Sequence, residues 1–215
     1  MSLHQVHVSQ HPLVAHKLSL LRDKSVAPKQ VRELVDELSM LLLTEATASL
    51  SLKDVGKVSA ACPLQEYNAV GLKERVGLVP VLRSGLGMVN AGLSLLPMAR
   101  VYHLGMYREK LTLQPVEYYN KLPEERDVDI CIVLDPMIAT GGTSVATVSA
   151  LKDWGADQIQ FVCICASQDG LAQLAAAHPD VVVHVGAIDN EIDANGYVMP
   201  GIGDSGDRLY NTPYL

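Results

Sequence analysis

Hydrophobic residues recur along the chain in two patterns, one helical and one typical of buried strands. After Pro28 they stand three or four positions apart, which predicts a long amphipathic helix; these residues are Val31, Leu34, Val35, Leu38, Leu41 and Leu42. From about residue 76, continuous apolar runs predict strands buried on both faces, at 76–82, 130–134, 159–166 and 181–188. Helical patterns at 86–96 and 145–154 lie between these strands, and Gly155 ends the second. The alternation predicts a doubly wound, mainly parallel α/β sheet flanked by helices.

The length of the chain favours a single domain. Its 215 residues, 48% of them hydrophobic, are enough for one sizeable core. We expect an N-terminal helical segment at about 12–50, a core at about 70–188, and a small hood formed by the termini. The tail at 190–215 is rich in Gly, Pro and Asp, which predicts ordered loop rather than sheet. Pro80 conflicts with its predicted strand, because proline cannot donate to a central ladder, so we place it at a strand end or a bulge.

Residues 108–126 interrupt this pattern of strands and helices. The run is polar and contains two prolines, Pro115 and Pro123, and two adjacent tyrosines, Tyr118 and Tyr119. A segment of this length without a core face predicts a projecting arm, which either closes over a ligand as a lid or holds an oligomer together. For the tyrosine pair, packing against a partner subunit is favoured over stacking on a base.

Composition and charge exclude several classes of protein. The 17 basic and 24 acidic residues give a net charge of −7, which argues against a nucleic-acid-binding surface. No apolar run reaches membrane-spanning length, and the N-terminal residues lack the pattern of a signal peptide, so we expect a cytoplasmic protein without a membrane partner. The four cysteines contain no CxxC and the seven histidines show no zinc-ligand spacing. Buried thiols in a reducing compartment are therefore expected.

The segment from Val133 to Ser144 carries the clearest chemistry. An apolar strand ends at Asp135, and a loop of small and hydroxyl-bearing residues then opens the next predicted helix. Two adjacent glycines, Gly141 and Gly142, allow the backbone to approach a phosphate closely, and the free N–H groups of the helix add donors. The sequence therefore predicts an anion site beside one carboxylate.

Two other segments are expected at the same edge of the sheet, because ligands of doubly wound sheets bind beyond the carboxyl ends of the strands. Arg83 precedes Ser84 and Gly85, and a guanidinium beside exposed backbone N–H groups suits a diphosphate. A solvated arginine at a strand end explains Arg83 equally well on local grounds. The glycine-rich run 201–206 matches the dinucleotide-binding fingerprint, but too few residues follow it for a βαβ unit. The run 191–202 lacks the final glutamate of a calcium loop.

Together these segments resemble the type I phosphoribosyltransferases, which use phosphoribosyl diphosphate (PRPP) and share an apolar strand, an acid and a Thr-Gly-Gly-Thr loop. The broad family usually has two adjacent acids, whereas this chain has Asp135-Pro136, a variant typical of the uracil phosphoribosyltransferase branch. The segment 79–87, the tyrosine-bearing arm and the tail 196–208 extend the resemblance over nearly the whole chain. The resemblance implies transfer of the 5-phosphoribosyl group from PRPP to N1 of uracil, which forms UMP and diphosphate in pyrimidine salvage.

The resemblance also implies the residues of the site. The catalytic residues would be Asp204, Arg108 and Asp135, with Asp204 near the N1 proton of uracil. The uracil-binding residues would be Val198, Gly203, Asp204 and Ser205. The PRPP-binding residues would be Arg83, Arg108, Asp135, Pro136, Met137, Ile138, Ala139, Thr140, Gly141, Gly142, Thr143 and Asp204. Mg²⁺ would be carried mainly by PRPP, with little direct ligation by the protein.

The hydrogen-bonding pattern of uracil agrees with a base site built from backbone. Its O2, N3–H and O4 present acceptor, donor and acceptor, and a tight glycine-rich segment offers N–H and C=O groups at close range. Cytosine would place an amino group against a backbone N–H, which is costly in a dry site.

Two alternative functions remain open at this point. The first is a phosphoribosyltransferase for another base; orotate requires a cation, for which only Arg208 is near, and a purine requires a wider site. The second is a PRPP-sensing regulator, which the acidic balance disfavours. The resemblance favours a homodimer or higher homo-oligomer and leaves open GTP as an effector.

Overall fold

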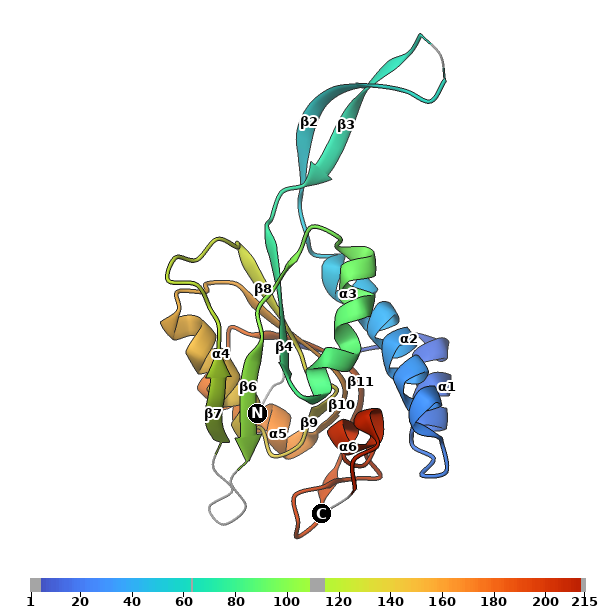
Figure 1. The fold of residues 1–215 in the computed structure, drawn as a ribbon, viewed down its shortest axis with the longest axis vertical. Helices are drawn as coiled ribbons and strands as arrows, with labels where there is room; N and C mark the ends of the chain where they lie inside the picture. Colours follow the sequence, from blue (N-terminus) through green and yellow to red (C-terminus); the bar gives the residue numbers. More distant parts are fainter. Residues whose placement is uncertain (1–4, 63, 109–114, 214–215) are drawn as a thin grey trace.

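Figure 1 shows the chain as a computed structural model, which describes residues 5–62, 64–108 and 115–213 but not the side chains of Tyr107, Arg108 and Pro115. At the centre of this part of the chain lies a nine-stranded sheet. Its strands in spatial order are β1 (Val6–Val8), β11 (Val182–Asp189), β10 (Ile159–Ser167), β8 (Ile130–Leu134), β4 (Val76–Leu82), β6 (Leu104–Arg108) and β7 (Pro115–Asn120), with β5 (Arg100–Val101) beside β4 and β9 (Met137–Ile138) beside β10.

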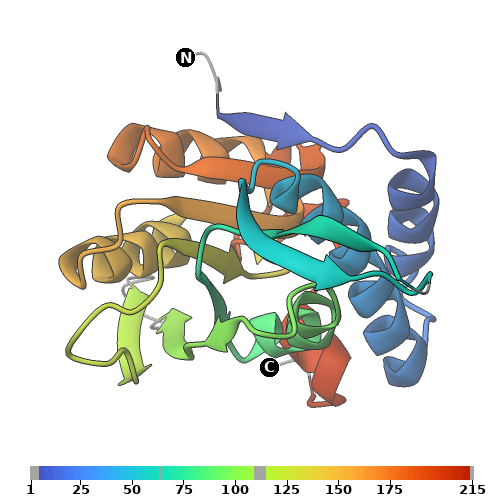
Figure 2. The ribbon, with the colours of Figure 1, turned by 90° about the horizontal axis from the view of Figure 1, so that it is seen from above.

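Helices cover both faces of this sheet. Neighbouring strands run parallel, except that β7 pairs antiparallel with β6 at one edge. One hydrophobic cluster joins the sheet to helices on the first face, α1 (Pro12–Leu21), α2 (Pro28–Thr47) and α3 (Val89–Leu95). A second cluster joins it to helices on the opposite face, α4 (Gly142–Asp153) and α5 (Gln168–Ala177) (Figure 2). The predicted doubly wound, mainly parallel α/β sheet is confirmed.

The sequence pattern explains the main elements. Helix α2 begins at Pro28, whose missing N–H is not needed in the first turn, and its apolar stripe is buried. Every residue of β10 is buried, as its continuous apolar run predicts. Gly155 follows α4 with a φ of +93°, the left-handed conformation that commonly ends a helix.

Pro80 lies inside β4, paired with Leu134 of β8, so its predicted place at a strand end or bulge is wrong. On the other side of β4, the pairing with β5 reaches Leu78 and the pairing with β6 begins at Val81. Pro80 falls in the interval between these two partners. No ladder bond on that side requires its missing N–H, which is why a central strand tolerates it.

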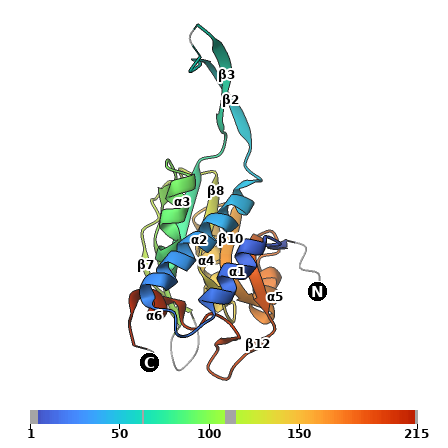
Figure 3. The same cartoon turned by 90° about the vertical axis from the view of Figure 1, so that its right-hand side faces the viewer.

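The projecting element of this structure is not the segment 108–126. In its described part, that segment contributes β7 to the edge of the main sheet, and residues 109–114 lie outside the described residues. A hairpin of β2 (Leu52–Ser59) and β3 (Glu66–Leu72) instead extends from the end of the molecule opposite the tail (Figures 1 and 3). Its large apolar side chains are exposed: Leu52, Val55, Val58, Leu64, Tyr67, Val70 and Leu72.

The tail contains more regular structure than the ordered loop that its composition predicts. Strands β12 (Glu191–Ile192) and β13 (Val198–Met199) form a short antiparallel pair, and helix α6 (Ser205–Tyr210) follows. The residues between β13 and α6 lie against the corner that joins α1 to α2, because Arg22 and Arg208 bond across that contact. These bonds join the N-terminal helices to the tail near the carboxyl end of β11.

Candidate active site

A cleft of about 1120 Å³ opens beyond the carboxyl ends of β4 and β8, where three segments distant in sequence meet. These segments lie at 81–84 after β4, at 135–143 after β8 and at 194–207 in the tail. Met106 and Tyr118, from the edge strands β6 and β7, complete the lining. The edge of the sheet at which the sequence predicts a ligand therefore carries a cleft.

Asp135 is a buried carboxylate in this cleft, 6% exposed. It accepts a hydrogen bond from the Ser84 hydroxyl at 2.9 Å and a longer one from the backbone N–H of Met137 at 3.4 Å. Burial raises the pKa of Asp135 to about 7; the two hydrogen bonds act in the opposite direction, and the charge of Asp204 raises it further. Gly85, next to Ser84, allows the backbone to pass close to the end of β8, because a Cβ on residue 85 would lie 2.2 Å from the Leu134 carbonyl oxygen.

The loop after Asp135 leads into helix α4 through a residue that must be glycine. Gly141 has a φ of +88°, and a Cβ on it would lie 2.6 Å from the Gly170 carbonyl oxygen. The Ser167 hydroxyl donates to the Ala139 carbonyl and so fixes the loop against α5. The first turn of α4 carries no acidic residue, so its free N–H groups and positive dipole end are available to an anion.

Arg83 lies across the cleft from this loop and is 53% exposed on its side chain. It follows β4 and precedes a 3₁₀ helix at Ser84–Met88. Its guanidinium bonds Asp207 of α6 at 3.0 Å and the Thr212 hydroxyl at 3.4 Å. The arginine predicted to bind diphosphate is therefore paired with a carboxylate from the tail.

The tail supplies the remaining wall through residues 194–198 and 203–207. We call residues 201–205 the base loop. Gly201 and Gly203 have φ values of +56° and +70°, which side chains rarely allow. Asp204 caps α6, because its carboxylate accepts from the backbone N–H of Asp207 at 2.9 Å. Asp204 therefore has a structural role at the start of α6, and it also lines the cleft.

The structure brings many of the predicted site residues to this cleft. Those that line it are Arg83, Asp135, Met137, Ala139, Thr143, Val198, Gly203, Asp204 and Ser205. Five others belong to the same loop but are not among the lining residues: Pro136, Ile138, Thr140, Gly141 and Gly142. Ile138 packs in the core below the loop. The side chain of Arg108 lies outside the described residues.

Several lining residues were missed or assigned elsewhere by the sequence. Tyr118, assigned above to a partner interface, lines the cleft and packs over Gly105, where a Cβ would lie 2.7 Å from its ring. Gly105 leaves room for the neighbouring tyrosines of β7, and this sequence feature points to the contact only once the pairing of β6 with β7 is known. Tyr197 enters from the β12–β13 turn. The pairing of Asp207 with Arg83 has no local signal, because 124 positions separate the two residues.

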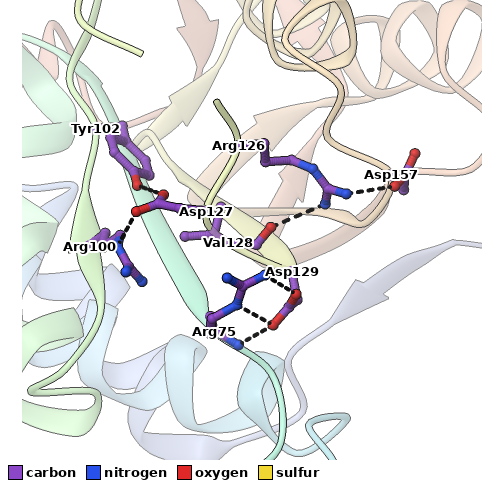
Figure 4. Close-up of polar contacts among 8 residues, drawn as sticks. All are labelled: Arg75, Arg100, Tyr102, Arg126, Asp127, Val128, Asp129 and Asp157. Atoms are coloured by element: carbon purple, nitrogen blue, oxygen red, sulfur yellow. Dashed lines mark hydrogen bonds and ion pairs between the residues drawn. The ribbon is translucent and has the colours of Figure 1, made fainter. Parts of the chain in front are cut away.

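A second charged cluster lies at the amino ends of β4 and β8 and serves as a contrast (Figure 4). It contains three ion pairs: Arg75–Asp129, Arg100–Asp127 and Arg126–Asp157. Arg75 bonds both carboxylate oxygens of Asp129, at 2.8 and 3.0 Å, and these hydrogen bonds lower the pKa of Asp129. Each carboxylate of this amino-end cluster has an arginine partner.

Two kinds of feature were sought in the described part of the chain and not found. No group of three or more His, Cys, Asp or Glu side chains there is arranged to hold a metal ion. No described helix combines the length and the apolar character that crossing a bilayer requires.

Comparison with known proteins finds relatives along nearly the whole chain. The family model described as uracil phosphoribosyltransferase matches residues 8–212. The chain is 54% identical over 208 residues to the uracil phosphoribosyltransferase of Roseiflexus castenholzii, covering 97% of this chain and 99% of that one. It is 46% identical over 208 residues to that of Listeria welshimeri, covering 96% and 98%. Among solved structures, the AQ2163 protein of Aquifex aeolicus matches with a TM-score of 0.91 at 31% identity, over 98% of this chain and 100% of that one.

Proposed function

Because the chain belongs to the uracil phosphoribosyltransferase family, we propose that its cleft transfers the 5-phosphoribosyl group of PRPP to N1 of uracil, forming UMP and diphosphate. One observation carries this proposal: the loop 136–143 after Asp135, which we call the anion loop, and the base loop both contribute to the lining of the same cleft. A sugar phosphate and a base bound to these two segments would face each other across it. The chain acts as a single phosphoribosyltransferase domain over residues 1–215.

The anion loop binds the 5′-phosphate of PRPP in this proposal. The backbone N–H groups of residues 139–143 and the hydroxyls of Thr140 and Thr143 are the donors, next to the positive end of α4. Asp135 accepts hydrogen bonds from the ribose hydroxyls, which requires its ionised form. The supporting observation is that Asp135 is buried and has only Ser84 and Met137 as its recorded donors, so ribose hydroxyls complete its bonding.

Arg83 and Arg108 neutralise the diphosphate. Arg83 is held by Asp207, so diphosphate must compete with that carboxylate for the guanidinium. Arg83 is half-exposed although Asp207 is largely buried, and a diphosphate offers several oxygens to the guanidinium where the carboxylate offers two. Release of Arg83 from Asp207 therefore accompanies PRPP binding.

The base loop binds uracil through backbone groups of Gly203, Asp204 and Ser205, with Val198 packing against the ring. Val198 is 6% exposed and lies next to the loop. Asp204 also assists removal of the N1 proton. If Asp204→Asn retained near-normal turnover with an unchanged pH profile, capping of α6 would be its whole role.

Mg²⁺ fits this cleft as an ion carried by PRPP. The cleft carries oxygen donors in Asp135 and Asp204, and magnesium usually keeps several waters and takes one or two carboxylates together with substrate oxygens. When bound, the ion would supply charge neutralisation to the departing diphosphate. The protein's own groups orient the ribose, hold the phosphate and keep water from the developing positive charge at C1′.

We also propose that the protein is a homo-oligomer. The support is the β2–β3 hairpin, whose apolar side chains lie on both of its faces without cover from the described body of the chain. A two-stranded hairpin is only marginally stable in water, and exposed apolar side chains of this number indicate contact with another chain. Sedimentation of the wild type and of Val58→Glu tests this: a shift of the variant to lower mass is expected.

Diphosphate release in the presence of PRPP and Mg²⁺ tests the function, with uracil, cytosine, orotate, adenine and hypoxanthine supplied separately. We expect release with uracil alone. Release with a different base would establish the first alternative, and binding of PRPP without release for any base would establish the regulator; the family relationship favours neither. Adding GTP to the same assay tests whether it is an effector. Because PRPP and UMP are charged and do not cross a bilayer unaided, we place the enzyme in the cytoplasm.

A further inference from the structure

The position of the base loop depends on whatever fixes its backbone. Gly201 and Gly203 occupy left-handed conformations, and glycine is the most flexible residue in the chain. The base is proposed to contact backbone groups of Gly203 and its neighbours, so a displacement of the loop would displace the donors themselves. The bonds made by Gly201 and Ile202, directly before Gly203, are therefore decisive.

Arg22 and Asp189 hold Gly201 from both sides. Asp189, the last residue of β11, is 7% exposed and accepts two hydrogen bonds from the Arg22 guanidinium, at 2.7 and 2.8 Å. It also accepts the backbone N–H of Gly201 at 2.9 Å, while Arg22 donates to the Gly201 carbonyl at 2.8 Å. One ion pair thus satisfies both backbone polar groups of a single glycine.

Arg208 holds the next residue in the same way. It is 8% exposed, and its guanidinium donates to the carbonyl oxygens of Ile202 at 2.7 Å, Leu21 at 2.6 Å and Asp23 at 2.8 Å. Leu21 and Asp23 flank Arg22 in the corner after α1. Both guanidinium groups therefore tie the base loop to one corner of the N-terminal helices.

The charges of Arg22 and Asp189 satisfy each other. Burial opposes ionisation of Asp189, but hydrogen bonds from Arg22, Cys165 and Gly201 outweigh it, so the pKa of Asp189 is lowered. The hydrogen bond with Asp189 raises the pKa of Arg22. Loss of either partner would leave the other charge partly buried and the Gly201 backbone without its partners.

We propose that Arg22, Asp189 and Arg208 are positioning residues for uracil, which fix the base loop against the corner between α1 and α2. The inference rests on the proposed base site. None of the three residues lines the cleft, so they act through the loop and not on the base. The anion loop is held by other elements, β8, α4 and α5. Apart from Asp204, the residues proposed to bind PRPP lie outside the base loop, so this corner affects PRPP binding less than uracil binding.

Steady-state kinetics of Arg22→Met and Asp189→Asn test the proposal, with KM measured separately for uracil and for PRPP. We expect the KM for uracil to rise about tenfold or more and the KM for PRPP to change less than about twofold. Arg22→Lys, which keeps the charge but cannot bond both Asp189 oxygens and the Gly201 carbonyl, is expected to restore part of the loss. The double variant is expected to cost less than the sum of the single ones.

Arg32→Met is the matched control. The Arg32 guanidinium donates a hydrogen bond to the Leu209 carbonyl of α6 at 2.9 Å, so Arg32 makes the same type of bond from α2 to a part of the tail outside the base loop. Its loss is expected to leave both KM values within about twofold. Thermal midpoints of all variants record the effect on stability separately.

The proposal is overturned if Arg22→Met or, where that variant does not fold, Arg22→Lys lowers only the thermal midpoint, or raises both KM values equally. Gly203→Ala separates this failure from failure of the base site. If Gly203→Ala raises the KM for uracil and the Arg22 variants do not, only the positioning role is wrong. If neither changes it, the base site itself is misplaced.

Discussion

The two ends of the central sheet differ in how their carboxylates are satisfied. At the amino ends of β4 and β8, each carboxylate of the cluster has an arginine partner (Figure 4). At the carboxyl ends, Asp135 is buried without a cationic partner among its recorded contacts, and its pKa is raised to about 7. The first arrangement lowers the pKa of Asp129, whereas the second keeps Asp135 near its titration point at neutral pH.

This difference indicates which end of the sheet carries function. The ion pairs of the amino-end cluster satisfy one another and contribute to fold stability. A buried carboxylate without a cation costs stability, so it is expected only where a ligand completes its bonding. The following predictions test this contrast in order of decreasing effect.

Asp135→Asn should produce the largest loss of activity. Removing the ionised acceptor for the ribose hydroxyls should lower kcat/KM for PRPP by about 100-fold or more, measured by initial rates of UMP formation. The same variant should unfold at a higher temperature than the wild type at pH 8, because it removes a buried charge. A variant with normal kcat/KM would place the ribose elsewhere.

Arg83→Met should raise the KM for PRPP by about tenfold and leave the KM for uracil nearly unchanged, because a diphosphate ligand loses a paired donor. Arg100→Met removes an arginine of the amino-end cluster and is the matched control, expected to change neither constant. If both variants raised the KM for PRPP alike, the effect of Arg83→Met would be explained by long-range charge and not by contact with the diphosphate.

The pH dependence of kcat/KM for PRPP should follow Asp135. Its pKa in the folded protein is raised to about 7, so the ionised form decreases below that pH and kcat/KM should fall about tenfold between pH 8 and pH 6. Ser84→Ala should move the inflection to higher pH, because the Ser84 hydroxyl lowers this pKa. Asp135→Asn should show no such inflection.

The contribution of Asp135 to the free energy of unfolding should decrease as the pH rises, whereas kcat/KM increases. A carboxyl group whose pKa is raised on folding stabilises the fold below its unfolded pKa, and that contribution is lost as the pH rises through about 7. The difference in thermal midpoint between Asp135→Asn and wild type should therefore be largest at pH 8 and small near pH 4. An unchanged difference across this window would contradict burial as the cause.

Asp129→Asn should have the smallest effect. It removes the negative charge and one of the two acceptor oxygens that face Arg75 in a partly exposed ion pair, and such pairs contribute little. We expect a thermal midpoint lower by no more than a few degrees and an unchanged kcat/KM. A large loss of activity would mean that the two ends of the sheet are coupled.

The sequence predicted the sheet and the strand after which the ligand site lies, but not the hairpin that projects from the molecule. Strands such as β10 are buried on both faces, so their continuous apolar runs could be recognised locally. The β2–β3 hairpin has no buried face in the single chain, and its mixture of apolar and charged residues gave no helical or strand signal. The arm was therefore predicted at 108–126, where prolines and polar residues are concentrated.

By itself, the sequence determined the chemistry of this protein: the acid, the glycines and the small-residue loop after β8, and a glycine-rich tail suited to a base. These features are local, because the backbone conformations that a small-residue or glycine-rich loop allows depend on a few neighbouring residues. Only the tertiary structure decided that Asp207 meets Arg83, that Tyr118 lines the cleft, and that Arg22 and Asp189 hold Gly201. The Arg83–Asp207 and Arg22–Gly201 contacts join residues more than a hundred positions apart. Asp189 reaches Gly201 from the end of β11, and Tyr118 reaches the cleft through the pairing of β7 with β6, and no local pattern specifies these contacts.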